Sequence, residues 1–136
     1  MDFERLKVFR QDRNRFCKKV GTSIDEVKLG YCRTSKTITE DDLNPIDRPH
    51  GGVYFTLADH AAGTAMASHG YAAVTSSATY NFFRAANLGD TLIAEAKEIK
   101  GGQTICVYDV NIFDQNGLLL GNGTFTFYRL EQKLSL

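Results

Sequence analysis

The stretch that decides the fold is HGGVYFTLADHAAGTAMASHG, residues 50–70, which is small, apolar and nearly uncharged. Its apolar residues cover much of the circumference of a helix that we expect from Gly51 to about Ser68, so other structure should enclose that helix. Asp59 is the only carboxylate in the stretch. Burying an acid is expensive unless its neighbours satisfy it, and the position of Asp59 therefore favours a functional role.

The same stretch opens with His50-Gly51-Gly52, which suits the start of a helix. The first N–H groups of a helix have no partner within it and attract anions. An unpaired N–H and a buried acid together indicate hydrolytic chemistry on a carbonyl. Gly51 and Asp59 are eight positions apart, hence about 12 Å along the axis and roughly 80° in rotation, so they cannot serve one carbonyl from the same chain. We therefore expect a twofold dimer with two composite sites, in which Asp59 of one subunit faces the helix start of the other.

The flanking sequence predicts an α+β fold. Residues 3–20 have the spacing of an amphipathic helix that ends at Gly21, and residues 27–39 are β-rich. Pro45 and Pro49 mark an irregular loop that leads to His50. Beyond Gly70, four further segments have strand character: 74–83, 91–99, 104–113 and 118–128. We expect one domain, residues 1–136, with an antiparallel sheet of about five or six strands packed on one long central helix, and an N-terminal helix.

Composition excludes several classes of function. Sixteen basic residues balance sixteen acidic ones, so overall charge recruits neither nucleic acid nor a membrane. The first twenty residues are basic, which we interpret as a solvated face. The three cysteines lack the spacing of a disulfide framework or a zinc site, and we expect no metal. We find neither a G-x-S-x-G elbow nor a phosphate-binding loop, and no apolar run resembles a signal or a membrane span, so we expect a cytoplasmic protein.

Several motifs resemble those of hotdog-fold acyl-CoA thioesterases, specifically the PaaI type of phenylacetate degradation. The pair His50-Gly51-Gly52 and Asp59, nine positions after His50, is a fairly specific combination. The resemblance runs from about Asn44 to Tyr128 and implies a sheet wrapped around the central helix. The other motifs that carry it are Asn44-Pro45, Leu57-Ala58-Asp59, Phe82-Phe83-Arg84, Gly89-Asp90, Gly102-Gln103-Thr104 and Val107-Tyr108-Asp109.

This resemblance implies a role for individual residues. Asp59 would be the nucleophile or the general base that activates water, and the Gly51 N–H would be the oxyanion donor. Asn44 would orient the water or the thioester, His50 would shape the turn or contact the thioester, and Thr75 would assist the water. The residues along the substrate and coenzyme A would be Gly52, Phe82, Phe83, Arg84, Gly102, Gln103 and Thr104.

Some positions also have plainer interpretations. Asn44 before Pro45 is typical of a turn, Arg84 of a surface arginine, and His60 and His69 of structural or surface histidines. Two residues depart from the family pattern: Asp47 stands where many relatives have glycine, and Ala85 where many have proline.

The resemblance implies hydrolysis of a small or aryl acyl-CoA to free acid and CoA, without metal or cofactor, by a homodimer that pairs again into a tetramer. Two alternatives stay open, because a fold does not fix a reaction. One is a hotdog hydratase or dehydratase acting on enoyl thioesters, and the other is a non-catalytic acyl-CoA binding module. Release of free thiol distinguishes hydrolysis from both.

Overall fold

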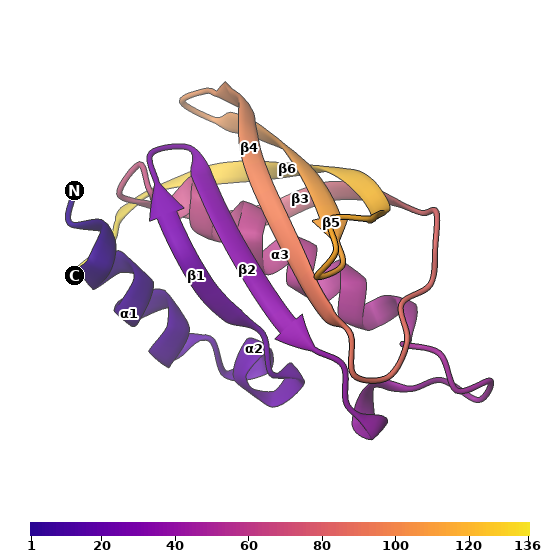
Figure 1. Ribbon diagram of the computed structural model, residues 1–136. Helices are drawn as coiled ribbons and strands as arrows, with labels where there is room; N and C mark the ends of the chain where they lie inside the picture. Colours follow the sequence, from indigo (N-terminus) through magenta and orange to yellow (C-terminus); the bar gives the residue numbers. More distant parts are fainter.

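A six-stranded antiparallel sheet curves around the long helix α3, Gly51–Ala67 (Figure 1). The computed structural model describes the whole chain, residues 1–136. Neighbouring strands pair in the order β1-β2-β4-β5-β6-β3. In the sequence α3 lies between β2 and β3, so it connects β2 to the strand at the far edge of the sheet. The strands are β1 (Ser23–Lys28), β2 (Tyr31–Thr37), β3 (Tyr71–Phe82), β4 (Thr91–Gly101), β5 (Ile105–Phe113) and β6 (Leu119–Lys133).

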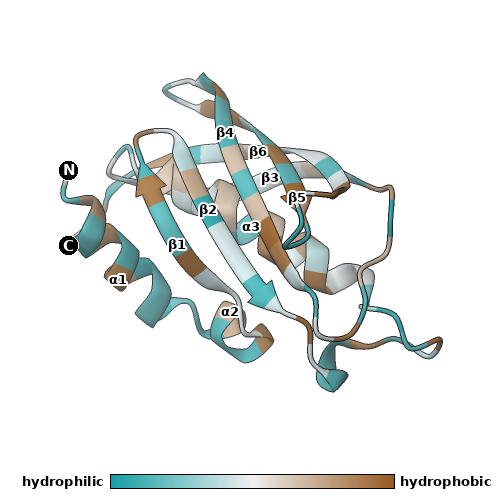
Figure 2. Cartoon of the chain, viewed as in Figure 1, coloured by the Kyte–Doolittle hydropathy of each residue, from teal (hydrophilic) through white to brown (hydrophobic).

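The sheet buries one face against α3, as the predicted alternation requires. Every second residue is buried along β5 and along the first half of β4, and hydrophobic and hydrophilic residues alternate there (Figure 2). The helix meets them with small side chains such as Ala58, Ala61 and Ala65, each fully buried. Small residues on the helix let the strands approach closely, and one cluster of 25 buried residues forms the core. The prediction of an enclosed central helix is confirmed.

The early β-rich region is a hairpin rather than one strand. Its two strands, β1 and β2, are joined at Gly30, which has φ 69°, a conformation that glycine adopts without strain. This hairpin gives the sheet its sixth strand.

The predicted N-terminal helix is two helices, α1 (Phe3–Arg13) and α2 (Arg15–Val20). The break lies at Asn14, whose side-chain Oδ1 accepts a hydrogen bond from the Cys17 N–H at 3.1 Å and so caps α2. Gly21 ends α2 with φ 93°, as predicted. The expected apolar face is wrong in part, because Leu6 and Cys17 are buried while Phe16 is 62% exposed.

A buried ion pair holds the loop that leads into α3. Lys36 Nζ lies 3.0 Å from Asp42 Oδ2, and both side chains are buried. Asp42 belongs to the short 3-10 helix η1 (Glu40–Asp42), and its carboxylate also accepts from the Thr39 N–H at 2.8 Å. The Asp42 carbonyl accepts from the His50 N–H at 2.8 Å. The start of α3 is therefore fixed to the sheet through β2.

One edge strand of the sheet is covered by a helix, and the other is uncovered. Helix α1 lies alongside the outer strand β1 (Figure 1), and Gln11 bonds its backbone: Oε1 accepts from the Ile24 N–H at 2.8 Å, and Nε2 donates to the Thr22 carbonyl at 3.2 Å. Strand β3 at the other edge pairs only with β6, so its outer backbone groups have no partner in the chain. An unpaired edge of 12 residues is a template for another strand.

None of the helices has the length and apolarity that crossing a membrane requires. The three cysteines are free thiols, and all three are buried.

Candidate active site

Asp59 and Thr75 form the centre of the candidate site. Asp59 lies midway along α3 and Thr75 on β3, and the Thr75 hydroxyl donates to Asp59 Oδ1 at 2.9 Å. Burial raises the pKa of the Asp59 carboxyl above its usual value, while the Thr75 hydrogen bond and the positive charge of Arg10 act in the opposite direction. The carboxylate is partly buried and held in one orientation, which suits a group that attacks or activates water.

Asp59 faces a small cavity of about 120 Å³. Residues of α1, α3, β3 and β6 line it, and many of them are polar, among them Arg10, Asn14, Asp59, His60 and Thr75. Such a cavity is large enough for a few non-hydrogen atoms and too small for a long acyl chain.

The N-terminus of α3 offers one free backbone donor. His50 is the N-cap residue, and its Nδ1 accepts from the Gly52 N–H at 2.8 Å. The His50 carbonyl accepts from the Val53 N–H at 3.0 Å, whereas the Gly51 N–H has no acceptor within the chain. Of the two glycines, Gly51 is thus the one whose N–H is available to a developing oxyanion, and the N–H of Gly52 is occupied.

A cavity of about 330 Å³ lies beside the free Gly51 N–H. It brings together five of the residues that the sequence singled out, which come from the loop before α3, the helix itself and the end of β3: Asn44, Gly51, Phe82, Phe83 and Arg84. Ala85 lines the same cavity.

Asn44 has the geometry of a turn residue, the alternative role that its position before Pro45 indicated. Its Oδ1 accepts from the backbone N–H groups of Ile46 at 3.0 Å and of Arg48 at 3.1 Å. The side-chain Nδ2 has no acceptor within the chain, so this amide N–H remains able to bind a ligand in the adjoining cavity. Asp47, in the same turn, has φ 57°, the left-handed region that favours glycine.

Gly51 and Asp59 line different cavities of the chain. Both are on helix α3, about 12 Å apart along its axis at 1.5 Å per residue. The structure therefore keeps the proposed acid and the proposed oxyanion donor of one chain apart, as the spacing predicted.

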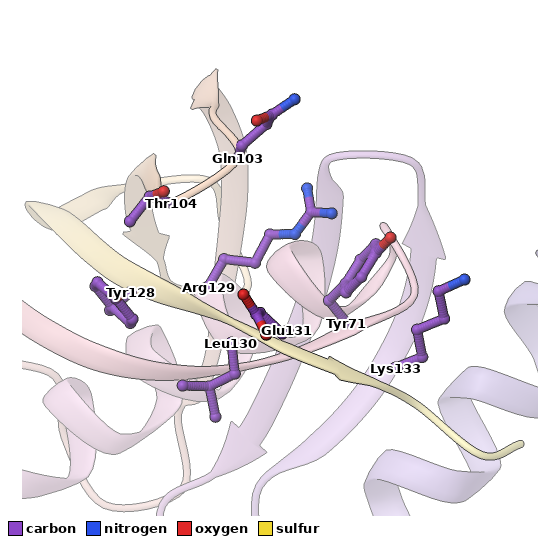
Figure 3. A pocket seen from close by; sticks show the side chains of 8 residues that line it. All are labelled: Tyr71, Gln103, Thr104, Tyr128, Arg129, Leu130, Glu131 and Lys133. Atoms are coloured by element: carbon purple, nitrogen blue, oxygen red, sulfur yellow. The ribbon is translucent and has the colours of Figure 1, made fainter.

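A third cavity, of about 530 Å³, lies between the β4–β5 turn and the end of β6 (Figure 3). Gln103 and Thr104 line it together with Arg129 and Lys133. The Arg129 guanidinium stacks over the Tyr71 ring at 3.6 Å, and Tyr71 also lines the cavity of Asp59, so the two cavities are neighbours. Gly102 is not among the lining residues; a side chain there would collide with the Ile105 carbonyl, so the tight turn requires glycine.

The two other histidines of the chain have structural partners. The His60 Nδ1 lies 2.8 Å from the Thr22 hydroxyl, and burial lowers the pKa of His60 to about 4, so the ring is neutral at physiological pH. The His69 Nε2 lies 2.6 Å from Glu98 Oε1.

Arg10 was not among the residues that the sequence singled out, and the prediction of a solvated basic face is wrong at this position. Arg10 lines the Asp59 cavity, and its Nε is buried without a hydrogen-bond partner. Gly63, one turn beyond Asp59, leaves room for this side chain, since a Cβ at Gly63 would lie 3.1 Å from an Arg10 Nη atom, but this relation is visible only in the structure. Nothing in the local pattern separates Arg10 from the other basic residues of α1.

Comparison with known proteins gives consistent results. The thioesterase superfamily model matches residues 49–120. The acyl-coenzyme A thioesterase PaaI of Escherichia coli K12 is 39% identical over 98 residues, which cover 72% of this chain and 70% of that protein. A putative esterase of Archaeoglobus fulgidus is 30% identical over 129 residues, which cover 95% of this chain and 84% of the relative.

Solved structures agree over most of the chain. The structure of E. coli PaaI superposes with a TM-score of 0.92 at 30% identity and covers 97% of this chain and 96% of that one. A hypothetical thioesterase protein of Streptococcus pneumoniae, solved with coenzyme A, has a TM-score of 0.79 at 30% identity and covers 84% and 92%. Two further structures of the pneumococcal protein replace an aspartate and a threonine by alanine, sixteen positions apart, the separation of Asp59 and Thr75 here. The chain therefore belongs to the thioesterase superfamily, as a PaaI-type thioester hydrolase with the hotdog fold.

Proposed function

We propose that this protein hydrolyses a small or aryl acyl-CoA to the free acid and CoA at sites shared between two subunits. Asp59 of one subunit activates water or attacks the thioester carbon, and the Gly51 N–H of the partner subunit stabilises the oxyanion. In the general-base form, Asp59 takes a proton from water, the new C–O bond forms, the C–S bond breaks, and the thiolate leaves and is protonated. The reaction needs neither a metal ion nor a cofactor.

The geometry around Asp59 supports its role. The carboxylate must be ionised to act as a base or a nucleophile, and the hydrogen bond from the Thr75 hydroxyl at 2.9 Å stabilises the ionised form. The same contact fixes which carboxylate oxygen remains free. The aspartate and threonine variants of the pneumococcal relative have the same separation in sequence, which supports a shared role for the pair.

The free N–H of Gly51 supports the second half of the site. It lies at the positive end of the α3 dipole, where an anion is favoured. In enzymes of this kind, removal of one oxyanion donor typically lowers kcat by about 10²–10³.

The unpaired edge of β3 supports the dimer. Two copies of β3 paired antiparallel would continue the sheet from one subunit to the other and set the two α3 helices antiparallel. Each Asp59 would then face the helix start of the partner subunit, and symmetry would create two equal sites. Val74 and Phe82 on β3 are 52% and 55% exposed in the single chain, and the dimer would cover part of this surface. A further pairing of dimers remains a prediction.

Cationic residues at two cavities support CoA as the leaving group. Arg84 lies at the cavity beside Gly51, and Arg129 and Lys133 lie with Gln103 and Thr104 at the third cavity. Arginine and lysine are the usual partners of phosphate groups, which CoA carries at its nucleotide end. The pneumococcal relative was solved with coenzyme A, which agrees with this assignment.

The Asp59–Thr75 hydrogen bond inside a cavity is the observation that carries the proposal, and Asp59→Asn tests it. This variant keeps the size of the side chain but removes the negative charge, so we expect thiol release from a panel of aliphatic and aryl CoA esters to stop while the fold is kept. Asp25→Asn is the matched control, because Asp25 is an exposed acid on β1. Wild-type kcat in Asp59→Asn on every ester that is hydrolysed would refute the assignment. Loss of enoyl absorbance without free thiol would indicate a hydratase instead.

A further inference from the structure

Arg10 is a cation with no charge partner in the chain. Its Nε is buried without a hydrogen bond, and none of the ion pairs of the protein includes it. Burial lowers the pKa of Arg10, yet an arginine remains charged at physiological pH. The side chain as a whole is half-buried, so the cost of leaving its charge without a partner is partial, and the cavity that Arg10 lines is the place where a partner can bind.

The space for this side chain is built into the fold. Arg10 extends from α1 to α3 at Gly63, where a Cβ would lie 3.1 Å from an Nη atom, so a larger residue would push the guanidinium out of place. Helix α1 is itself fixed to β1 by the two hydrogen bonds of Gln11 and by the fully buried Leu6. The guanidinium is therefore held at the cavity wall by packing.

Asp59 forms no direct ion pair with this cation, although the two opposite charges attract each other across the cavity. No Asp59 oxygen is within ion-pair distance of Arg10, and Oδ1 is engaged by Thr75. The two charged groups line the same cavity of about 120 Å³, which suits a short acyl group rather than a long chain. A short acyl group whose carbonyl carbon meets Asp59 would place its other end near Arg10.

The Arg10 guanidinium indicates which chemical group the far end of the acyl group carries. A guanidinium offers five N–H groups and no acceptor, and a carboxylate matches it with two parallel hydrogen bonds. We propose that Arg10 is the specificity residue of the acyl site and that it selects CoA esters of short dicarboxylic acids, whose free carboxylate pairs with the guanidinium. This inference rests on the hydrolytic function proposed for Asp59. The pairing also neutralises the negative charge of the substrate, so that a second carboxylate can enter while Asp59 stays ionised.

Matched pairs of esters test the proposal. Succinyl-CoA and butyryl-CoA have the same chain length and differ by a carboxylate in place of a methyl group, and malonyl-CoA and propionyl-CoA form a second pair. The assay is thiol release with the enzyme-free rate subtracted. We expect the wild-type kcat/KM to be higher for the dicarboxylic member of at least one pair by about 30-fold or more, since a desolvated charge pair contributes at least about 2 kcal/mol.

Arg10→Met removes the charge and keeps much of the length. It should lower kcat/KM for the dicarboxylic ester by about 30-fold or more relative to the neutral ester. Any loss on the neutral ester measures what the charge of Arg10 contributes to the ionised Asp59. Arg10→Lys keeps the charge but lacks the planar guanidinium, so its kcat/KM for the dicarboxylic ester should lie between the values of wild type and Arg10→Met. Arg5→Met is the matched control, because Arg5 is an exposed arginine of the same helix.

Two results would overturn the inference. One is a wild-type preference for the neutral member of both pairs, which needs no variant and so does not depend on how Arg10→Met folds. The other is an equal loss on both members of a pair in Arg10→Met, which would mean that Arg10 acts on Asp59 or on the fold. Asp59→Asn separates the two proposals: if it abolishes turnover of all four esters, the hydrolytic function stands even where the selectivity fails. If it leaves turnover intact, the proposed function itself is wrong.

Discussion

Removal of the Gly51 N–H is the most direct test of the proposed composite site, and Gly51→Pro achieves it with little backbone strain. Gly51 is the first residue of α3, where proline is well tolerated because the N–H has no helical partner. His50 has φ −60° and ψ 140°, the extended conformation that a residue before proline requires. The added Cβ would lie 3.3 Å from the Phe82 ring, a half-exposed side chain that would have to move by a few tenths of an ångström. Gly51→Ala adds the same Cβ and keeps the N–H, and is therefore the matched control.

We expect Gly51→Pro to lower kcat by about 10²–10³, the usual effect of losing one oxyanion donor. Gly51→Ala should keep kcat within about tenfold, well short of that loss. The decisive measurement uses a heterodimer of Gly51→Pro and Asp59→Asn subunits, purified through two different tags and assayed for thiol release. One of its two sites receives both defects and the other receives neither, so turnover per dimer should return to about half of the wild-type value.

The recovery follows only if the two groups act across the subunit boundary. If each chain used its own Asp59 and Gly51, both sites of the heterodimer would carry a defect and turnover would stay at the level of the parent variants. A heterodimer without recovery would therefore refute the composite site, as would wild-type turnover by a monomer.

Three further predictions concern the residue beside Asp59 and the loop that leads into α3. Thr75→Val removes the hydrogen bond that favours the ionised Asp59, so the pKa of Asp59 rises and the acid limb of the kcat/KM profile should move to higher pH, with the largest loss at low pH. Asp42→Ala leaves the buried Lys36 without its partner and should lower the free energy of unfolding by about 3–5 kcal/mol, measured in urea. Asp47→Gly relieves a positive φ and should raise the free energy of unfolding by about 0.5–1 kcal/mol.

Each of these predictions has a result that contradicts it. An unchanged acid limb in Thr75→Val would show that the hydroxyl does not tune Asp59. Asp41→Ala is the control for Asp42→Ala, because Asp41 is an exposed neighbour, and equal stability of these two variants would mean that the buried pair contributes nothing. A less stable Asp47→Gly protein would show that the Asp47 side chain supports the turn by more than its backbone strain costs.

Much of the fold was predictable because its signals are local. The helix from Gly51, its stop near residue 68 and the four later strands follow from periodicities that extend over a few residues. The Gly30 hairpin and the break at Asn14 were missed because a short β-rich run and a basic helix do not show where they fold back or end. Gly30 needs a positive φ and Asn14 caps α2, and either role is visible only once the backbone path is known.

The candidate site was likewise predictable in part from the sequence and in part only from the structure. The sequence by itself predicted which groups would carry the chemistry, the acid at residue 59 and the amide at residue 51, and it determined that their spacing on a helix keeps them apart. Only the tertiary structure decided that β3 brings Thr75 to Asp59 and that, of the basic residues in α1, Arg10 is the one that enters the cavity. The physical reason is that helix geometry is set by neighbours within a turn, whereas the burial and partners of a side chain depend on segments far away in sequence that pack against it.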